Sequence, residues 1–352
     1  MSCLDPPLST LDFICDLVPL SLLARATPHD VTAVFYHTIS DASLPHVAPL
    51  YGIKTPEDFE LDLVFLQRNF TVVSHDDLVA HRTGTRPLPP RAAAISFDDG
   101  FAECFTLARP LLRKHGLPAT FFVCNGFIDN QALMYRNRVA LCVSRLDATP
   151  PGKRNVQLEM LRQRCTFAGD SLRGARAWLL GLKFSESRQI DLACECLGIS
   201  VADFLRDARP YMTRDQIGQL HAEGFTIGAH TDNHPQLHQL GDWNDVREQI
   251  RTSCDLVRTM TGRRRVPFAF PFNGLSLSRQ KLKGLMAELD SIDLMYDTNN
   301  LMRDSEFIVN RIWCDTPHGA DRSRSNLSTL IGRAHVLEPA RALRRRLRRA
   351  AS

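Results

Sequence analysis

The chain alternates between short runs of apolar residues and longer stretches in which apolar positions recur every three or four residues. The short runs are rich in β-branched and aromatic residues and predict buried strands, at 31–37, 71–74, 92–97, 119–123, 225–230, 266–272 and 306–313. The periodic stretches predict helices with one apolar face, at 56–70, 101–116, 213–224, 243–262 and 278–289. Alternating strands and helices at this spacing predict a parallel α/β fold, although the pattern does not separate a barrel from an open sheet.

Residues 130–210 interrupt this alternation. Their composition is helical, as in ESRQIDLACECLGI at 186–199, so they are interpreted as a helical insertion within a domain that spans residues 31–320. Residues 1–30 are predicted to form an N-terminal helical extension. Residues 321–352 are predicted to form a basic C-terminal tail.

Composition places the chain among soluble globular proteins. Of its 352 residues, 44% are hydrophobic and 23% are charged, which is sufficient for a large core. The net charge of +4 is mild, so nucleic acid is not an expected partner. Six arginines lie at 340–350 and account for much of the excess positive charge. No stretch reaches the roughly 18 uncharged apolar residues needed to span a bilayer.

Ten cysteines are scattered along the chain without a C-x-x-C motif, and the closest two, Cys194 and Cys196, are too near each other for a usual zinc site. Most are expected to be small buried residues, and many free thiols favour a reducing compartment. The first 26 residues lack a basic segment and contain interrupting aspartates, which argues against a signal peptide. A cytoplasmic location is therefore expected, with export left open.

Two adjacent carboxylates, Asp98 and Asp99, directly follow the predicted strand 92–97. Active sites form at the carboxyl ends of strands in parallel α/β folds, and Gly100 permits a sharp exit from the strand. Alone, the pattern is equally typical of a turn that caps the next helix.

His230 ends the strand 225–230 and His234 follows it, and a helical turn between them would bring both imidazoles to one ion. Alone, the pair is weak evidence. Together with the two aspartates it predicts a metal site of one carboxylate and two imidazoles, and leaves the second carboxylate free to act as a base. A third segment, Phe270–Gly274, also ends a strand, although an ordinary turn would look the same.

These three motifs, SFDDG, HTDNH and FPFNG in this order, resemble the polysaccharide deacetylase family, which contains the chitooligosaccharide deacetylase homology region and is carbohydrate esterase family 4. The resemblance covers roughly residues 31–315, with 130–210 as its divergent part. The opening VFYHTISD and the segment FELDLVFLQRNFTVVSHDDL look most like bacterial exopolysaccharide deacetylases, including those that act on poly-N-acetylglucosamine.

The resemblance implies a distorted (β/α)7-type barrel and one divalent ion, commonly zinc. By motif position Asp99, His230 and His234 would be the metal ligands, and Asp98 would be the general base. The backbone N–H of Phe272, which follows Pro271, would stabilise the oxyanion together with the metal.

Two departures from the family pattern concern the groups around the base and the acid. Ala269 stands where many members carry an arginine that orients the base, an arginine that the exopolysaccharide branch often lacks. The C-terminal Leu-x-His motif is missing as well. In the poly-N-acetylglucosamine branch a Tyr-His motif after the first strand supplies the acid, and Tyr36-His37 matches it.

His37 is therefore the candidate proton donor, the alternative being a buried histidine bonded to backbone. His318 is a weaker candidate for the same role. Arg311, on the last predicted strand, is assigned either to substrate or oxyanion contact or to support of the site, and a lone arginine of this kind is otherwise expected in a surface ion pair.

The expected function is metal-dependent removal of an N-acyl group, acetyl first, from an amino sugar in a polysaccharide, oligosaccharide or sugar-lipid. One alternative is a deformylase or another non-peptide amide hydrolase of the same fold, and a second is a non-catalytic carbohydrate-binding barrel. Expected partners are the N-acetylated glycan or sugar-lipid. The basic tail suggests peripheral membrane contact, or else a solvated segment.

Overall fold

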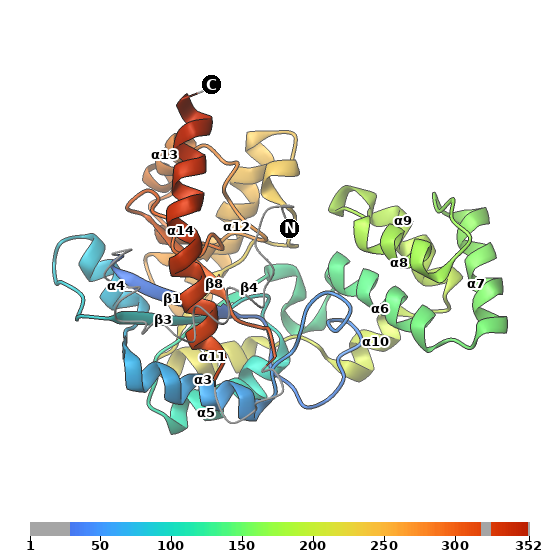
Figure 1. Cartoon of the computed structure of the whole chain (residues 1–352), viewed down its shortest axis with the longest axis horizontal. Helices are drawn as coiled ribbons and strands as arrows, with labels where there is room; N and C mark the ends of the chain where they lie inside the picture. Colours follow the sequence, from blue (N-terminus) through green and yellow to red (C-terminus); the bar gives the residue numbers. More distant parts are fainter. Residues whose placement is uncertain (1–28, 318–324, 351–352) are drawn as a thin grey trace.

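The structure, a computed structural model, describes residues 29–317 and 325–350. The helical extension predicted for residues 1–30 falls almost entirely outside these ranges. The chain folds into a barrel of parallel strands with helices around it and a helical body at one side (Figure 1).

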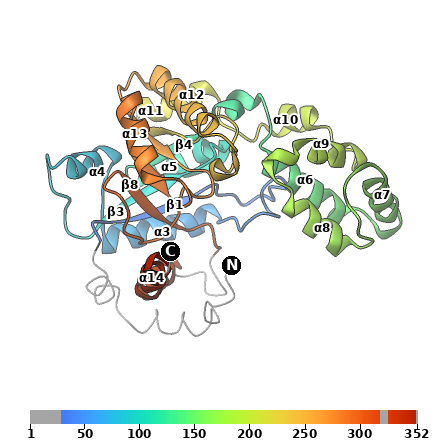
Figure 2. The ribbon, with the colours of Figure 1, turned by 90° about the horizontal axis from the view of Figure 1, so that it is seen from above.

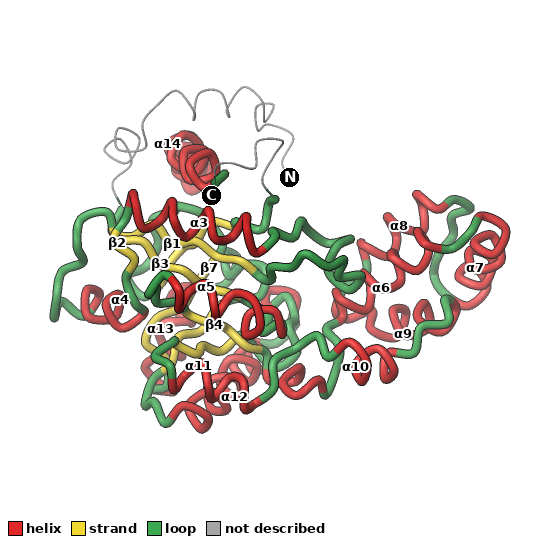
Figure 3. The backbone as a smooth tube through the Cα atoms, turned by 90° about the horizontal axis from the view of Figure 1, so that it is seen from below, coloured by secondary structure: helices red, strands yellow, loops and turns green. Residues whose placement is uncertain are grey.

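All strand pairs are parallel, and their order is β1-β8-β7-β6-β5-β4-β3-β2, with a further pairing of β1 and β3. This last pairing closes β1 and β3–β8 into a seven-stranded barrel, while β2 extends β3 at its start. Figure 3 shows the strands at the centre of this part of the molecule. The barrel expected from the resemblance is therefore confirmed. The strands are β1 (Val31–Tyr36), β2 (Thr71–Val72), β3 (Ala92–Phe97), β4 (Thr120–Val123), β5 (Thr226–Ala229), β6 (Val266–Ala269), β7 (Ile292–Asp297) and β8 (Ile308–Trp313).

Strand β7 was not predicted, because two aspartates interrupt its apolar run IDLMYD. The structure gives both carboxylates partners. Asp293 lies 3.0 Å from the Nε2 atom of His75, and Asp297 accepts a 3.0 Å hydrogen bond from the N–H of Gly274. Paired carboxylates can lie in a strand that apolar patterning alone would not identify.

Helices on the outside of the barrel begin at polar caps, as Thr55, Ser74, Thr213 and Ser278 each accept a backbone N–H of the first turn. The helix predicted at 101–116 contains a π-helical segment, η1 (Cys104–Ala108), that runs directly into α5. The outer helices are α3 (Pro56–Asn69), α4 (His75–Arg82), α5 (Arg109–Lys114), α11 (Arg214–Ala222), α12 (Trp243–Thr261) and α13 (Arg279–Leu289), and short 3-10 turns lie at η2 (Asn125–Asn130) and η4 (Leu237–Gln239).

Between β4 and α11 the chain forms a body of five helices beside the barrel (Figure 2). Its helices bury apolar residues against one another, among them Leu146, Leu161, Leu179 and Ile190. Seven of the eight cysteines in the described ranges are buried, as predicted. The helices are α6 (Tyr135–Ala148), α7 (Pro151–Arg164), α8 (Leu172–Gly181), α9 (Ser187–Cys196) and α10 (Val201–Ala208), with the 3-10 turn η3 (Phe184–Glu186).

The C-terminal segment, assigned to a tail from its composition, forms helix α14 (Leu327–Ala350). Its first turns lie against the barrel, where Leu327 and Ile331 are fully buried. The prediction of a tail relied on the basic residues at the end of this segment. It did not use the apolar residues at the start, which predict a packed helix. Within the described residues, no helix is both long and apolar enough to cross a membrane.

A buried polar cluster joins the start of α14 to the barrel. The Lys54 ammonium, with no exposed side-chain area, donates to the Asp62 carboxylate and to Asn326 at 2.7 Å. The hydroxyls of Tyr36 and Ser325 donate to the two oxygens of Asp62, at 3.0 and 2.5 Å. The carboxylate therefore connects β1, α3 and the residues before α14.

Replacing Asp62 with alanine is expected to lower the free energy of unfolding by about 3–5 kcal/mol, because the Lys54 ammonium would stay buried without its counter-charge. Urea denaturation followed by circular dichroism measures the change. The double variant Lys54→Met with Asp62→Leu removes both charges and should lose less. An Asp62→Ala protein that unfolds at the wild-type urea concentration would contradict this role.

Candidate active site

The predicted site residues converge at the rim where the parallel strands end. Asp98 and Asp99 follow β3, His230 follows β5, and His37 follows β1. They line a cavity of about 360 Å³. Its other lining residues are Phe35, Leu50, Tyr51, Met134, Arg136, Asn137, His234, Phe272, Asn273, Thr298 and Trp313.

Asp99, His230 and His234 form a buried group with the spacing of metal ligands. The Nε2 atoms of His230 and His234 lie 3.4 and 3.2 Å from Oδ1 of Asp99, and the candidate ligand atoms all lie within 4.8 Å of one another. Ligand atoms bonded at about 2.0–2.1 Å to a tetrahedral zinc ion are separated by about 3.3 Å. The three side chains therefore fit a divalent cation.

Hydrogen bonding also prepares these residues for a cation. The Nδ1 atom of His230 lies 2.9 Å from the carbonyl oxygen of Ala269, and donation to that carbonyl leaves the Nε2 lone pair for a ligand bond. Oδ1 of Asp99 is buried and has no hydrogen-bond donor among the described residues. A buried acceptor without a donor is costly, and a cation would satisfy it.

The protonation states suit the same purpose. Burial lowers the pKa of His234, which keeps its imidazole neutral. Burial alone would raise the pKa of Asp99, but the adjacent imidazoles of His234 and His230 hold it well below its ordinary value. An ionised carboxylate and neutral imidazoles are the forms that bind metal ions.

The two histidines do not converge through a helical turn, so that expectation is wrong. Residues 230–234 form an irregular loop in which Thr231 and His234 have positive φ, of 66° and 59°, and Thr231 Oγ1 accepts a 3.0 Å bond from the His234 N–H. Asp99 and Phe272 also adopt positive φ, of 71° and 60°. Left-handed backbone at non-glycine residues is strained, and here it gathers at the site.

Asp98 is held by a buried arginine. Nη1 and Nη2 of Arg311 donate to Oδ1 and Oδ2 of Asp98 at 2.7 and 2.8 Å, and Nη1 also donates to Oγ of Ser96. Burial alone would raise the pKa of Asp98, but the Arg311 guanidinium lowers it below the ordinary value. The carboxylate is thus ionised and fixed in direction.

The surface ion pair considered for Arg311 is wrong, because this side chain has no exposed area. Arg311 is also not among the residues that line the cavity. It lies behind Asp98, and in this chain β8 supplies a guanidinium to that carboxylate, while β6 carries Ala269.

His37 is paired with Asp315, which follows β8. The Nδ1 atom of His37 lies 2.5 Å from Oδ2 of Asp315, and the backbone N–H of His37 donates to Oδ1 at 3.0 Å. Burial alone would lower the pKa of His37, but the Asp315 carboxylate raises it to about 9. The ring stacks on Tyr51, with centroids 4.7 Å apart. His318, the weaker candidate, lies outside the described residues.

Phe272 lines the cavity, and its ring centroid lies 5.1 Å from that of His234. Its carbonyl accepts a 2.5 Å bond from Thr298 Oγ1, whereas none of the described residues accepts a bond from its N–H. That donor is available to a ligand. Pro271 is buried and is not among the lining residues.

Sequence reasoning missed Asp315, Tyr51 and Arg136 as site residues. Asp315 carries the same signal as Asp98, a carboxylate just past a strand end, and could have been found. Tyr51 lies in a loop, and Arg136 lies in the insertion, where no strand end marks a site.

Comparison with known families agrees with this geometry. Residues 85–164 and 184–284, just over half of the chain, match the family model described as polysaccharide deacetylase. The matched ranges contain Asp98, Asp99, His230, His234 and Phe272, while His37 and Arg311 lie outside them. No protein of curated function matches the sequence at a significant level.

Two solved structures share the fold. The deacetylase PplD of Streptococcus pyogenes, solved in complex with acetate, has a TM-score of 0.50 at 16% identity, over 82% of this chain and 93% of that one. IcaB from Ammonifex degensii has a TM-score of 0.51 at 15% identity, over 87% of this chain and 97% of that one. At such identities the likeness establishes the fold.

Proposed function

Since the chain belongs to the polysaccharide deacetylase family, which hydrolyses non-peptide carbon–nitrogen bonds, we propose that it removes the acetyl group from an amino sugar with Asp98 as base and His37 as acid. One observation carries this division of roles. A carboxylate, a set of three metal ligands and a paired histidine line the same cavity at the strand ends.

Asp98 suits the role of base because it is ionised and held beside Asp99. When bound at Asp99, His230 and His234, a divalent cation supplies a Lewis acid that polarises an amide carbonyl and lowers the pKa of water. Oδ atoms of Asp98 take the proton as water attacks the acetyl carbon. Arg311 keeps the Asp98 carboxylate ionised before that transfer and holds its orientation during the transfer.

His37 supplies the opposite transfer. With a pKa of about 9 it is protonated at neutral pH, and Asp315 on Nδ1 leaves Nε2 as the donating atom. The proton goes to the sugar nitrogen as the carbon–nitrogen bond breaks, so that an amine leaves rather than an amide anion. The free N–H of Phe272 donates to the oxyanion that forms at the carbonyl.

We propose zinc as the cation, because two imidazoles and one carboxylate with open positions are a typical catalytic zinc set. Elemental analysis of protein purified without added metal tests this. One equivalent of zinc supports the proposal, and another metal in its place would contradict it.

The activity is tested by measuring acetate release from N-acetylated oligosaccharides, polysaccharides and sugar-lipids, with and without chelator. Chelator-sensitive acetate release supports the proposal. Preferred release of formate from matched N-formyl substrates would favour a deformylase. No release from any substrate would favour a carbohydrate-binding barrel.

Replacing Asp315 with asparagine is expected to move the alkaline limb of the kcat/KM profile to lower pH by at least about one unit. The active form needs His37 protonated, so activity falls as pH rises through its pKa, which the Asp315 carboxylate raises to about 9. Without that charge, only the Asp99 and Asp98 carboxylates oppose the lowering effect of burial on the pKa of His37. The acid limb, which reflects Asp98, is an internal control and should stay at the same pH. An alkaline limb that does not move would show that His37 is not the general acid.

A further inference from the structure

Arg136 is a cationic residue of the cavity wall that the proposed reaction does not use. It lies in the first turn of α6, in the helical insertion, and lines the cavity together with the metal ligands and the base. Its Nη1 donates to the carbonyl of Leu180 at 2.9 Å. No Asp or Glu among residues 29–317 and 325–350 forms an ion pair with it, whereas nearby Arg138 pairs with Asp191.

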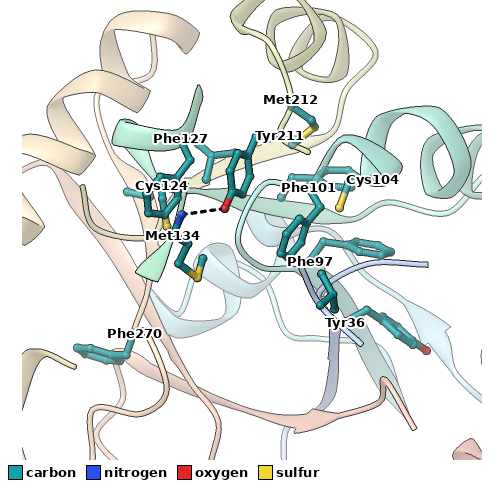
Figure 4. Close-up of a cluster of buried hydrophobic side chains, with 14 of the residues drawn as sticks. Tyr36, Phe97, Phe101, Cys104, Cys124, Phe127, Met134, Tyr211, Met212 and Phe270 are labelled. Atoms are coloured by element: carbon teal, nitrogen blue, oxygen red, sulfur yellow. Dashed lines mark hydrogen bonds between the residues drawn. The ribbon is translucent and has the colours of Figure 1, made fainter. Parts of the chain in front are cut away.

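The element that carries Arg136 is firmly held. The buried neighbour Asn137 donates to the carbonyl of His46 at 2.7 Å and accepts from the hydroxyl of Tyr211 at 2.5 Å. The N–H of Met134 donates to the same hydroxyl at 3.1 Å, as Figure 4 shows. These bonds hold the first turn of α6 in place. The backbone that carries the Arg136 guanidinium is therefore already ordered before a ligand binds.

Most charged groups around the cavity already have a partner of opposite charge. Asp98 pairs with Arg311, and His37 pairs with Asp315. Asp99 would be engaged by a divalent cation held at the site. Arg136 is the remaining charged side chain of the cavity wall, and no acidic partner for it lies among the described residues.

The insertion that carries Arg136 also has a net positive charge. Residues 130–210 contain 13 Lys and Arg against 8 Asp and Glu, while the rest of the chain contains 30 against 31. A body of net positive charge beside the cavity attracts ligands of negative charge and raises their association rate.

We infer that the substrate is an acidic glycan or glycoconjugate, and that Arg136 binds a carboxylate or phosphate close to the acetylated sugar. The inference rests on the proposed function and narrows its substrate class. A guanidinium with no acidic partner offers a planar pair of donors that matches both oxyanions in a bidentate way. Arg136 is in this role a specificity-determining residue.

The test compares substrates of different charge in the full-length protein and in the variant Arg136→Gln. The acidic probes are a tetrasaccharide of alternating glucuronate and N-acetylglucosamine, for the carboxylate, and N-acetylglucosamine 1-phosphate, for the phosphate. The neutral probe is tetra-N-acetylchitotetraose. Arg136→Gln should lower kcat/KM about 10- to 100-fold for the acidic probe that fits and less than about threefold for the neutral one.

Arg145→Gln is the matched control, because it removes the same charge from an exposed position on α6. Arg145→Gln should show the wild-type preference for acidic over neutral probes. Arg136→Lys, which keeps the charge, should retain part of that preference. Calorimetric binding of the probes to metal-free protein gives a readout independent of turnover. There Arg136→Gln should weaken binding of the acidic probe by a similar factor.

An equal loss for neutral and acidic probes would overturn the inference and make Arg136 a contact to sugar hydroxyls. An unchanged preference in Arg136→Gln would also overturn it, while acetate release from the neutral probe would leave the proposed function standing. If none of these probes releases acetate, binding to the metal-free protein still decides whether Arg136 selects acidic ligands, and acetate release from the wider set of substrates decides the proposed function.

Discussion

Replacing Asp98 with asparagine is expected to slow acetate release by about 10²- to 10⁴-fold while one equivalent of metal stays bound. The change removes the group that accepts the proton and leaves Asp99, His230 and His234 untouched, and positioned bases contribute about this factor. Asparagine has nearly the same shape, so the cavity keeps its form. Its amide oxygen can still accept one bond from Arg311.

The measurement pairs initial rates with elemental analysis and thermal unfolding of the same preparation. Ser96→Ala is the matched control, because Ser96 is the other side-chain acceptor of Arg311 Nη1 and takes no part in proton transfer. Its rate should fall less than about tenfold. Near wild-type turnover in Asp98→Asn would show that another group is the base.

Replacing His230 with alanine is expected to abolish stoichiometric metal binding and to lower kcat/KM about a thousandfold. A Lewis acid contributes several kcal/mol to the transition state, and about 4 kcal/mol corresponds to this factor. His230 supplies one of the three ligand atoms, and the Ala269 carbonyl holds its ring in position through Nδ1. Alanine at this position provides neither the ligand atom nor a partner for that carbonyl.

Metal content after dialysis and the zinc concentration that restores half of the activity measure this effect. His115→Ala is the control, since this histidine lies on the surface between Glu60 and Gln67. It should bind metal as the wild type does. Retention of one tightly bound equivalent in His230→Ala would mean that the cation lies elsewhere.

The sequence predicted most of the barrel because buried parallel strands are continuous apolar runs. It could not decide between barrel and open sheet, since that depends on whether β1 pairs with β3, and only the family resemblance pointed to closure. Strand β7 was missed because its two aspartates are satisfied by His75 and by the Gly274 N–H, which are distant in sequence.

At the site, the metal ligands were predictable because each follows a strand end within a short motif. The support behind them was not. Arg311 meets Asp98 across 213 positions of sequence, and Asp315 meets His37 across 278. Each pair depends on β8 lying next to β1, and no local pattern carries that adjacency.

The same adjacency has a consequence for biosynthesis. Strand β1 is complete at Tyr36, but its neighbour β8 begins at Ile308 and the acceptor Asn326 for Lys54 comes later still. At about 5–20 residues per second, the ribosome needs roughly 15–60 s to supply them. During that interval the nascent chain holds an open sheet edge, and the Lys54 ammonium lacks its Asn326 acceptor, so we expect the ring to close, and hydrolytic competence to appear, only after β8 has emerged from the ribosome.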